Sequence, residues 1–170
     1  KLSENSTGVE RHSLTINDIA MYIYTSGTTG LPKAALITNG RAVKTSFAGQ
    51  FLGFRAKQKD VLYLTLPLYH ATGLLWSWAG ALRGGATTVI KEKFSASEFW
   101  PDVRKHNATM FGYVGELCRY LMNVPPSDED KNHNLRVISG NGLRPDIWEK
   151  FQDRFSIPKI RELYGATEGV

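Results

Sequence analysis

The sequence predicts an α/β fold, in which a layered and mostly parallel sheet is flanked by helices. Two observations support this prediction. Short runs rich in β-branched and aromatic residues alternate along the chain with stretches whose apolar residues recur every three or four positions. Glycine-rich or polar segments follow several of the β-rich runs, as ligand-binding loops do at the carboxyl ends of parallel strands.

The β-rich runs have lengths typical of strands. We expect strands at residues 20–24, 61–66, 87–91, 109–114, 135–139 and 160–164. The stretches between them place their apolar residues on one side of a helix, where packing in the core is the expected role. These faces comprise Val43, Phe47 and Phe51; Leu74, Leu75, Trp78 and Leu82; Phe99, Trp100 and Val103; Leu117, Tyr120 and Leu121; and Ile147, Trp148, Phe151 and Phe155.

The chain is organised as a short polar linker followed by one domain. Residues 1–17 contain Gly8 and several Ser and Asn residues, so we expect a loop or linker there. Residues 18–170 carry the strand and helix patterns and are expected to form the domain. A polar break at residues 125–130 is expected to be a surface loop.

The composition excludes some classes of protein. Of 170 residues, 42% are hydrophobic and 22% are charged, as in globular rather than disordered chains. The net charge is +5, but the Lys and Arg residues are scattered, so we do not expect nucleic-acid binding. The single cysteine, Cys118, cannot form an internal disulfide, and no basic-then-apolar leader opens the sequence. A reducing, cytoplasmic location is therefore expected.

Residues 25–33 have the composition of a loop that holds a polyphosphate. Glycines allow backbone N–H groups to approach a ligand, hydroxyls add donors, and a lysine adds positive charge. The residues concerned are Thr25, Ser26, Gly27, Thr28, Thr29, Gly30 and Lys33. The segment is not a Walker A loop, because Pro32 and Ala34 stand where that motif needs Gly and Ser or Thr. A simple turn with an exposed lysine is the alternative.

The segment YGATEG at residues 164–169 is a second candidate ligand site. Tyr164 offers a ring on which a base can stack, and Thr167 offers a hydroxyl. The carboxylate of Glu168 beside a phosphate would require a cation between them, and Mg²⁺ is the natural choice. Alternatively, Thr167 and Glu168 are only the cap of a helix.

Two further segments follow predicted strands. Gly140, Asn141 and Gly142 permit close backbone approach and could form a wall beside a flat ring, or only a tight turn before the helix that Pro145 begins. His70 ends the run LPLYH and could be a base, a gate or a structural residue. No metal-ligand spacing joins the histidines to one another or to Cys118, and no G-x-S-x-G motif indicates a serine hydrolase.

Together, these segments resemble the acyl-adenylate-forming superfamily of acyl-CoA synthetases, adenylation domains and firefly-type luciferases. YTSGTTGLPK resembles its phosphate loop, and YGATEG resembles its second core motif, Y-G-x-T-E. The runs PKAA, LPLYH, KFSASEFW, GELCRYL and GNGLRPDIW are similar to the fatty acid transport protein group of long-chain and very-long-chain acyl-CoA synthetases. The resemblance covers the chain from Asp18 to Gly169.

The resemblance implies a two-step reaction. A fatty acid reacts with Mg-ATP to give acyl-AMP and pyrophosphate, and coenzyme A then displaces AMP. By resemblance, residues 25–30 and Lys33 hold the β- and γ-phosphates, while Gly140, Asn141 and Gly142 flank the adenine opposite Tyr164. Thr167 contacts the α-phosphate, Glu168 binds Mg²⁺, and His70 lines the junction of acyl chain and thiol. Thr167, Glu168 and Lys33 are thus the catalytic candidates.

The resemblance also marks two departures. Asn39 stands where many relatives have His in T-H-x-N, and we expect it to affect only the start of a helix, where Asn is a good N-cap. The ribose-binding Asp, the hinge and the small C-terminal domain with the adenylation lysine lie beyond the second motif in the superfamily. We therefore expect this piece to carry much of an ATP site without completing the reaction cycle.

Two alternatives to the acyl-CoA synthetase remain open. An adenylating enzyme could pass the acyl group to another acceptor, and a fatty-acid uptake or binding protein could have only secondary catalysis. Fatty acid and CoA are the expected partners, and peripheral attachment to the cytoplasmic face of a membrane would suit a substrate that partitions into bilayers. The sequence predicts neither acyl chain length nor oligomeric state.

Overall fold

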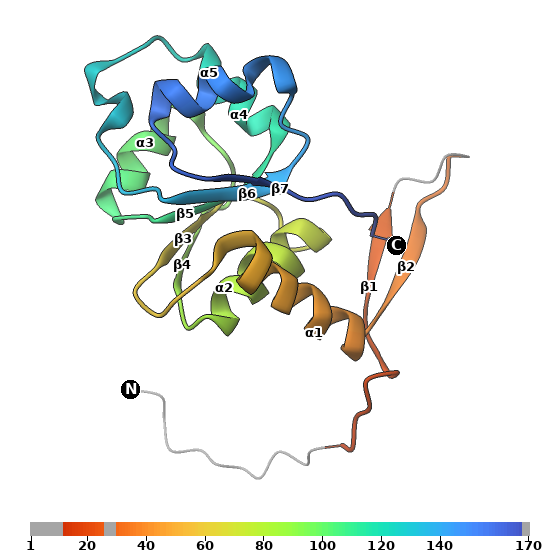
Figure 1. Cartoon of the computed structure of the whole chain (residues 1–170). Coiled ribbons are helices and arrows are strands. Elements are labelled where there is room, and N and C mark those ends of the chain that lie inside the picture. The colour runs from red at the N-terminus through yellow and green to blue at the C-terminus, as the bar shows by residue number, and fades with distance from the viewer. Residues whose placement is uncertain (1–11, 26–29, 168–170) are drawn as a thin grey trace.

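A five-stranded parallel sheet forms the centre of the molecule, as shown in the computed structural model, which describes residues 12–25 and 30–167 (Figure 1). The strand order is β4-β3-β5-β6-β7, and every neighbouring pair is parallel. The strands are β3 (Val61–Leu64), β4 (Thr87–Ile90), β5 (Met110–Val114), β6 (Val137–Asn141) and β7 (Ile160–Glu162). This arrangement confirms the predicted α/β fold class and five of the predicted strands.

Helices cover both faces of this sheet (Figure 1). One face carries α3 (Ala96–Lys105), α4 (Gly115–Asn123) and α5 (Pro145–Phe155). On the other face, α1 (Asn39–Ala48) continues into the π-helical turn η1 (Gly49–Phe54), and the π-helical turn η2 (Thr72–Trp78) continues into α2 (Ala79–Arg83). No helix of the described residues is both long and apolar enough to cross a membrane.

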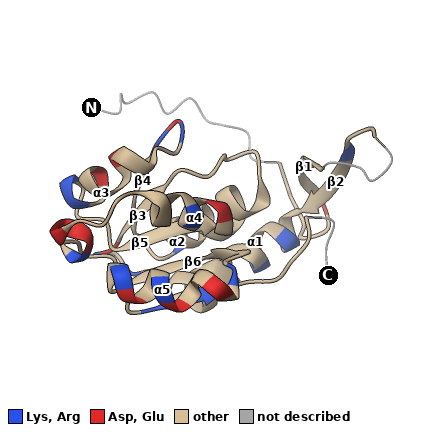
Figure 2. Ribbon diagram, turned by 90° about the horizontal axis from the view of Figure 1, so that it is seen from above, with Lys and Arg blue, Asp and Glu red and all other residues tan. Residues whose placement is uncertain are grey.

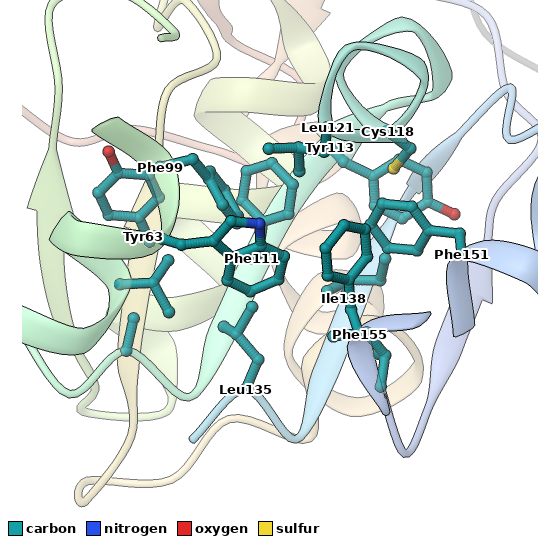
Figure 3. Close-up of a cluster of buried hydrophobic side chains, with 14 of the residues drawn as sticks. Tyr63, Phe99, Phe111, Tyr113, Cys118, Leu121, Leu135, Ile138, Phe151 and Phe155 are labelled. Carbon is teal, nitrogen blue, oxygen red and sulfur yellow. The ribbon is translucent and has the colours of Figure 1, made fainter. Parts of the chain in front are cut away.

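The strands of the sheet bury both faces because their side chains alternate between two cores. Tyr63, Phe111 and Ile138 point into a cluster rich in aromatic rings beneath α3, α4 and α5 (Figure 3). Leu62, Met110 and other neighbours pack on the opposite side, against the layer that contains η1 and α2. The predicted core role of Phe99, Trp100, Val103, Leu121, Phe151 and Phe155 is confirmed, because each is at most 6% exposed.

The first predicted strand does not belong to the parallel sheet. β1 (Ile19–Thr25) pairs with β2 (Lys33–Thr38) in a separate antiparallel hairpin. The expectation that this strand belongs to the parallel sheet was therefore wrong, and β2 was not predicted. The physical reason is the short connection between the two strands, which suits a hairpin, whereas a parallel crossover needs a dozen or more residues.

The expected core face of α1 and η1 is also wrong, because Val43, Phe47 and Phe51 are 39–56% exposed. The buried residues of this segment are instead Gly49, Gly53 and Phe54, all in η1. A Cβ atom at Gly49 would overlap the backbone carbonyl of Trp76, so only glycine permits η1 and η2 to pack this closely. Phe47 and Phe51 stack on each other with 5.9 Å between ring centroids.

An ion pair between the buried Asp60 and the partly exposed Arg136 lies at the amino edge of the parallel sheet. Asp60, 1% exposed and adjacent to β3, accepts hydrogen bonds from Arg136 (Nε 2.7 Å, Nη2 2.6 Å), Thr109 Oγ1 (2.9 Å) and the Lys57 amide (2.9 Å). Burial would raise the pKa of Asp60, but these hydrogen bonds and the charge of Arg136 outweigh it and lower the pKa. Arg136 also donates to the Phe54 carbonyl at 3.0 Å, which ties the end of η1 to the sheet.

The polar break at residues 125–130 is a surface loop with one anchored side chain. Ser127 caps the short 3₁₀ turn η3 (Asp128–Lys131), where Asp130 faces inward. Asp130 accepts a hydrogen bond from Arg154 Nε of α5 at 2.7 Å, and the side chains of both residues are largely buried. The predicted loop is therefore fixed to the body of the domain by an ion pair.

Candidate functional site

A cleft with a volume of about 430 Å³ opens between α1, η2 and the segment that follows β7. The α1 wall consists of Arg41, Lys44, Thr45 and Ala48, and the η2 wall of Ala71, Thr72, Leu75 and Trp76. Ile37 of β2 and residues 163–167 complete the lining. The cleft therefore lies beyond the carboxyl end of β7, where open parallel sheets commonly bind ligands.

Two of the residues predicted from YGATEG line this cleft. Tyr164 is 98% exposed, so its ring is accessible for stacking, and Thr167 lies three residues further along. Arg41 Nη2 donates a hydrogen bond of 3.1 Å to the carbonyl oxygen of Ala166. This bond joins α1 to a segment 125 residues away, so that Tyr164 and Thr167 line the same cleft as the apolar residues of η2.

The predicted turn at residues 140–142 lies directly beside the start of this segment. Gly140 is buried at the end of β6, and its carbonyl accepts a hydrogen bond of 2.8 Å from the Leu163 amide. A Cβ atom at Gly140 would overlap the Tyr113 carbonyl, and Gly142 has a left-handed φ of 79°. Glycine is thus required at both positions by close approach and by backbone conformation. The side-chain Oδ1 atom of Asn141 is buried without a hydrogen-bond partner among the described residues.

The side chain of Glu162 holds this turn in place through hydrogen bonds. Its carboxylate accepts hydrogen bonds from the amides of Gly142 (2.9 Å) and Leu143 (3.0 Å) and from the hydroxyl of Tyr113. Burial, followed by the hydrogen bond to Glu162, raises the pKa of Tyr113, so the phenol stays protonated and donates. One carboxylate therefore connects β5, β7 and the turn after β6.

The other predicted residues that the structure describes do not line the cleft. Thr25 and Lys33 pair across the hairpin at its loop end, Gly30 has a left-handed φ of 102°, and none of the three contributes to the lining. His70 is exposed, and its ring contacts Tyr69 with centroids 4.7 Å apart, next to the lining residue Ala71. The predicted residues Ser26, Gly27, Thr28, Thr29 and Glu168 lie outside the described residues.

The sequence did not single out several residues that build the site. Arg41 and Lys44 were part of a helix with no assigned role, and Glu162 was only the middle of a predicted strand. A signal for Arg41 and Lys44 was present, since they share one helical face with Thr45 and Ala48. Asn39 was expected to be the N-cap, but Thr38 takes that role and accepts a hydrogen bond from the Arg41 amide at 3.2 Å. Asn39 Nδ2 instead donates to the Thr15 carbonyl at 3.0 Å.

No group of three or more His, Cys, Asp or Glu side chains suited to a metal ion occurs within residues 12–25 and 30–167. Mg²⁺ that arrives with a nucleotide needs only one or two protein carboxylates, because phosphate oxygens and water complete its shell. The cleft itself combines the accessible ring of Tyr164, three threonine hydroxyls, two cationic side chains and an apolar wall. This set suits a ligand with an aromatic base, an anionic centre and an apolar part.

The sequence matches the protein-family model described as "AMP-binding enzyme" over residues 2–170. It is 52% identical over 154 residues to mouse long-chain fatty acid transport protein 3, a stretch that covers 91% of this chain and 23% of that protein. It is also 46% identical to a medium/long-chain-fatty-acid–CoA ligase of Mycobacterium tuberculosis, over 89% of this chain and 26% of the ligase. The chain spans about a quarter of the length of these curated relatives.

Solved structures share the fold. A ternary product complex of a malonyl-CoA ligase with methylmalonyl-CoA and AMP superposes with a TM-score of 0.78 and 29% identity, over 91% of this chain and 34% of that one. ATP-bound MatB from Rhodopseudomonas palustris superposes with a TM-score of 0.76 and 26% identity, over 91% and 30% of the two chains.

Proposed function

Because the chain belongs to the AMP-binding enzyme family, we propose that it is part of a ligase that activates a long- or very-long-chain fatty acid. In the first step, a carboxylate oxygen bonds to the α-phosphorus of ATP as the bond to the β-phosphate oxygen breaks, which releases pyrophosphate. In the second, the thiolate of coenzyme A bonds to the acyl carbon and displaces AMP. The similarity to a fatty-acid–CoA ligase and to a malonyl-CoA ligase supports this proposal.

The observation that carries the proposal is the cleft itself, in which the hydrogen bond from Arg41 to Ala166 connects α1 to the segment after β7. It brings Tyr164 and Thr167 together with an apolar wall, as a reaction between a nucleotide and a fatty acid requires. We assign Tyr164 and the turn at residues 140–142 to the adenine ring, and Thr167 to the α-phosphate. Residues 25–30 and Lys33 would hold the β- and γ-phosphates, and Glu168 would hold the Mg²⁺ that accompanies ATP.

The chemistry needs positive charge more than a protein nucleophile. A carboxylate and ATP are both anions, so their approach is opposed by repulsion, and negative charge shifts toward the leaving pyrophosphate in the transition state. Cationic side chains, backbone N–H groups and Mg²⁺ lower this barrier when they are fixed in place before the reaction. The substrate carboxylate is itself the nucleophile of the first step.

Exchange of labelled pyrophosphate into ATP tests the first step in the full-length protein. We expect exchange that depends on a long-chain fatty acid and disappears in Glu168→Ala, while the control Glu149→Ala, on the exposed side of α5, retains it. Release of AMP that depends on coenzyme A tests the second step. Absence of fatty-acid-dependent exchange in the wild-type protein would overturn the proposal, and exchange without CoA-dependent AMP release would indicate a different acyl acceptor.

A second candidate is fatty-acid uptake, which the names of several relatives favour. The two candidates differ in their dependence on adenylation. Uptake into cells that express Glu168→Ala should fall with ligase activity if uptake follows from acyl-CoA formation. Uptake that persists in this variant would support a transport function independent of the ligase reaction.

A further inference from the structure

The α1 wall of the cleft changes from cationic to apolar side chains along the helix. Arg41, Lys44, Thr45 and Ala48 follow one another at helical spacing and form one continuous face of the helix. The cationic residues lie toward the start of the helix, and Ala48 lies at its end. A ligand that follows this wall therefore meets positive charge first and an apolar surface afterwards.

The cationic end lies next to the segment assigned to the α-phosphate. Arg41 reaches Ala166 through its 3.1 Å hydrogen bond, and Thr167 is the next residue. The apolar end faces η2, because Gly49, which follows Ala48, packs directly on the backbone of Trp76. Trp76 lines the cleft, as does Leu75, which packs with Ile37 near the start of α1. An anionic group bound at Arg41 would thus lie near Thr167, with an attached chain directed toward Trp76.

Within residues 12–25 and 30–167, neither of these cations is paired with a carboxylate. α1 contains Arg41 and Lys44 and no acidic residue (Figure 2). Within the described part of the chain, Lys44 forms no hydrogen bond or ion pair, and the hydrogen-bond partner of Arg41 is a neutral carbonyl. No Asp or Glu is among the described residues that line the cleft. In contrast, Lys91, Arg136 and Arg154 are each paired with a carboxylate.

We infer that Arg41 and Lys44 bind the carboxylate of the fatty acid and orient it toward the α-phosphate, while Leu75 and Trp76 receive the beginning of the acyl chain. This inference rests on the proposed function. An N–H of the guanidinium and the ammonium group each offer a charge-assisted hydrogen bond to a carboxylate oxygen. Phosphate groups of ATP share the same chemistry, but the apolar wall that continues from the two cations favours a carboxylate with a long chain.

The test compares Lys44→Gln, Arg41→Gln and the double variant with the wild-type full-length protein. The control is Lys59→Gln, which removes an exposed cation that does not line the cleft. We expect each single variant to raise KM for fatty acid about tenfold, and the double variant about a hundredfold, since a charge-assisted hydrogen bond contributes on that order. KM for ATP should change less than about twofold. Lys44→Gln is decisive because Lys44, unlike Arg41, supports no backbone segment.

A binding assay separates the carboxylate from the chain and from catalysis. Palmitate and hexadecanol are used as probes, because hexadecanol has the chain without the charge. The double variant should weaken palmitate binding and leave hexadecanol binding unchanged, even if the wild-type protein shows no pyrophosphate exchange. The inference is overturned if KM for ATP rises instead, or if palmitate and hexadecanol respond equally. It is also overturned if the wild-type protein exchanges pyrophosphate and the double variant keeps its KM for fatty acid.

Discussion

The two ends of the parallel sheet differ in how their charged groups are satisfied. At the amino edge, Asp60 is buried and bound by Arg136, Thr109 and the Lys57 amide. Beyond the carboxyl edge, Arg41 and Lys44 face a cleft without a carboxylate among the described lining residues. A charge whose partners all lie within the chain stabilises the fold, whereas a charge that faces a cleft without a counter-ion is available to a ligand.

The turn at residues 140–142 lies between these extremes. Glu162 is an exposed residue whose carboxylate nevertheless accepts three internal hydrogen bonds, and two of its donors are backbone amides of a turn that we assign to adenine. We therefore regard Glu162 as a positioning residue, which acts on the nucleotide through the shape of the turn.

The largest effect is expected from breaking the ion pair at the amino edge. Arg136→Ala leaves the buried carboxylate of Asp60 without its cationic partner, although Thr109 and the Lys57 amide still donate to it, so the free energy of unfolding should fall by about 2–3 kcal/mol. Urea denaturation of the chain measures this loss. The control is Arg144→Ala, because Arg144 and Asp146 form an exposed pair that should contribute less than about 1 kcal/mol. Equal losses in the two variants would contradict a structural role specific to the Asp60–Arg136 pair.

An intermediate effect is expected from Glu162→Gln. The amide is nearly isosteric, but it is neutral and cannot accept from all three donors as a carboxylate does. We expect KM for ATP to rise about tenfold, which corresponds to about 1.4 kcal/mol, with little change in KM for fatty acid. Glu149→Gln serves as the control on the exposed side of α5. If both KM values rise together, Glu162 has a general structural role rather than one in positioning the turn.

The smallest effect is expected when stability is compared at neutral and acidic pH. The pKa of Asp60 is lowered in the folded state, so its contribution to stability is fully present above the ordinary Asp pKa of about 4 and is lost as the pH falls through the lowered value. The free energy of unfolding should therefore fall more steeply below about pH 4 in the wild-type chain than in Asp60→Asn. Measurements between pH 7 and pH 3 check this difference. Parallel curves would show that Asp60 is not held ionised by its partners.

The sequence predicted much of the sheet because burial on both faces leaves a strong local pattern. Runs such as 61–64 and 110–114 are almost continuously apolar or aromatic, and the helices between them repeat at helical spacing. The hairpin was not predicted, because β2 follows directly on the glycine- and proline-containing loop and its pairing with β1 is not visible in its composition. The exposed face of α1 was missed for a similar reason, since Val43, Phe47 and Phe51 have the spacing of a core face.

The sequence by itself determined the fold class, the family motifs and the candidate residues Tyr164 and Thr167, because these depend on residue types at fixed spacing. Only the tertiary structure decided which residues share the cleft. Arg41 and Ala166 are 125 positions apart, and the roles of Lys44, Trp76 and Glu162 depend on neighbours from other elements. Such contacts are set by the way helices pack on the sheet, through close approaches such as that of Gly49 to Trp76, and no local pattern in the sequence encodes them.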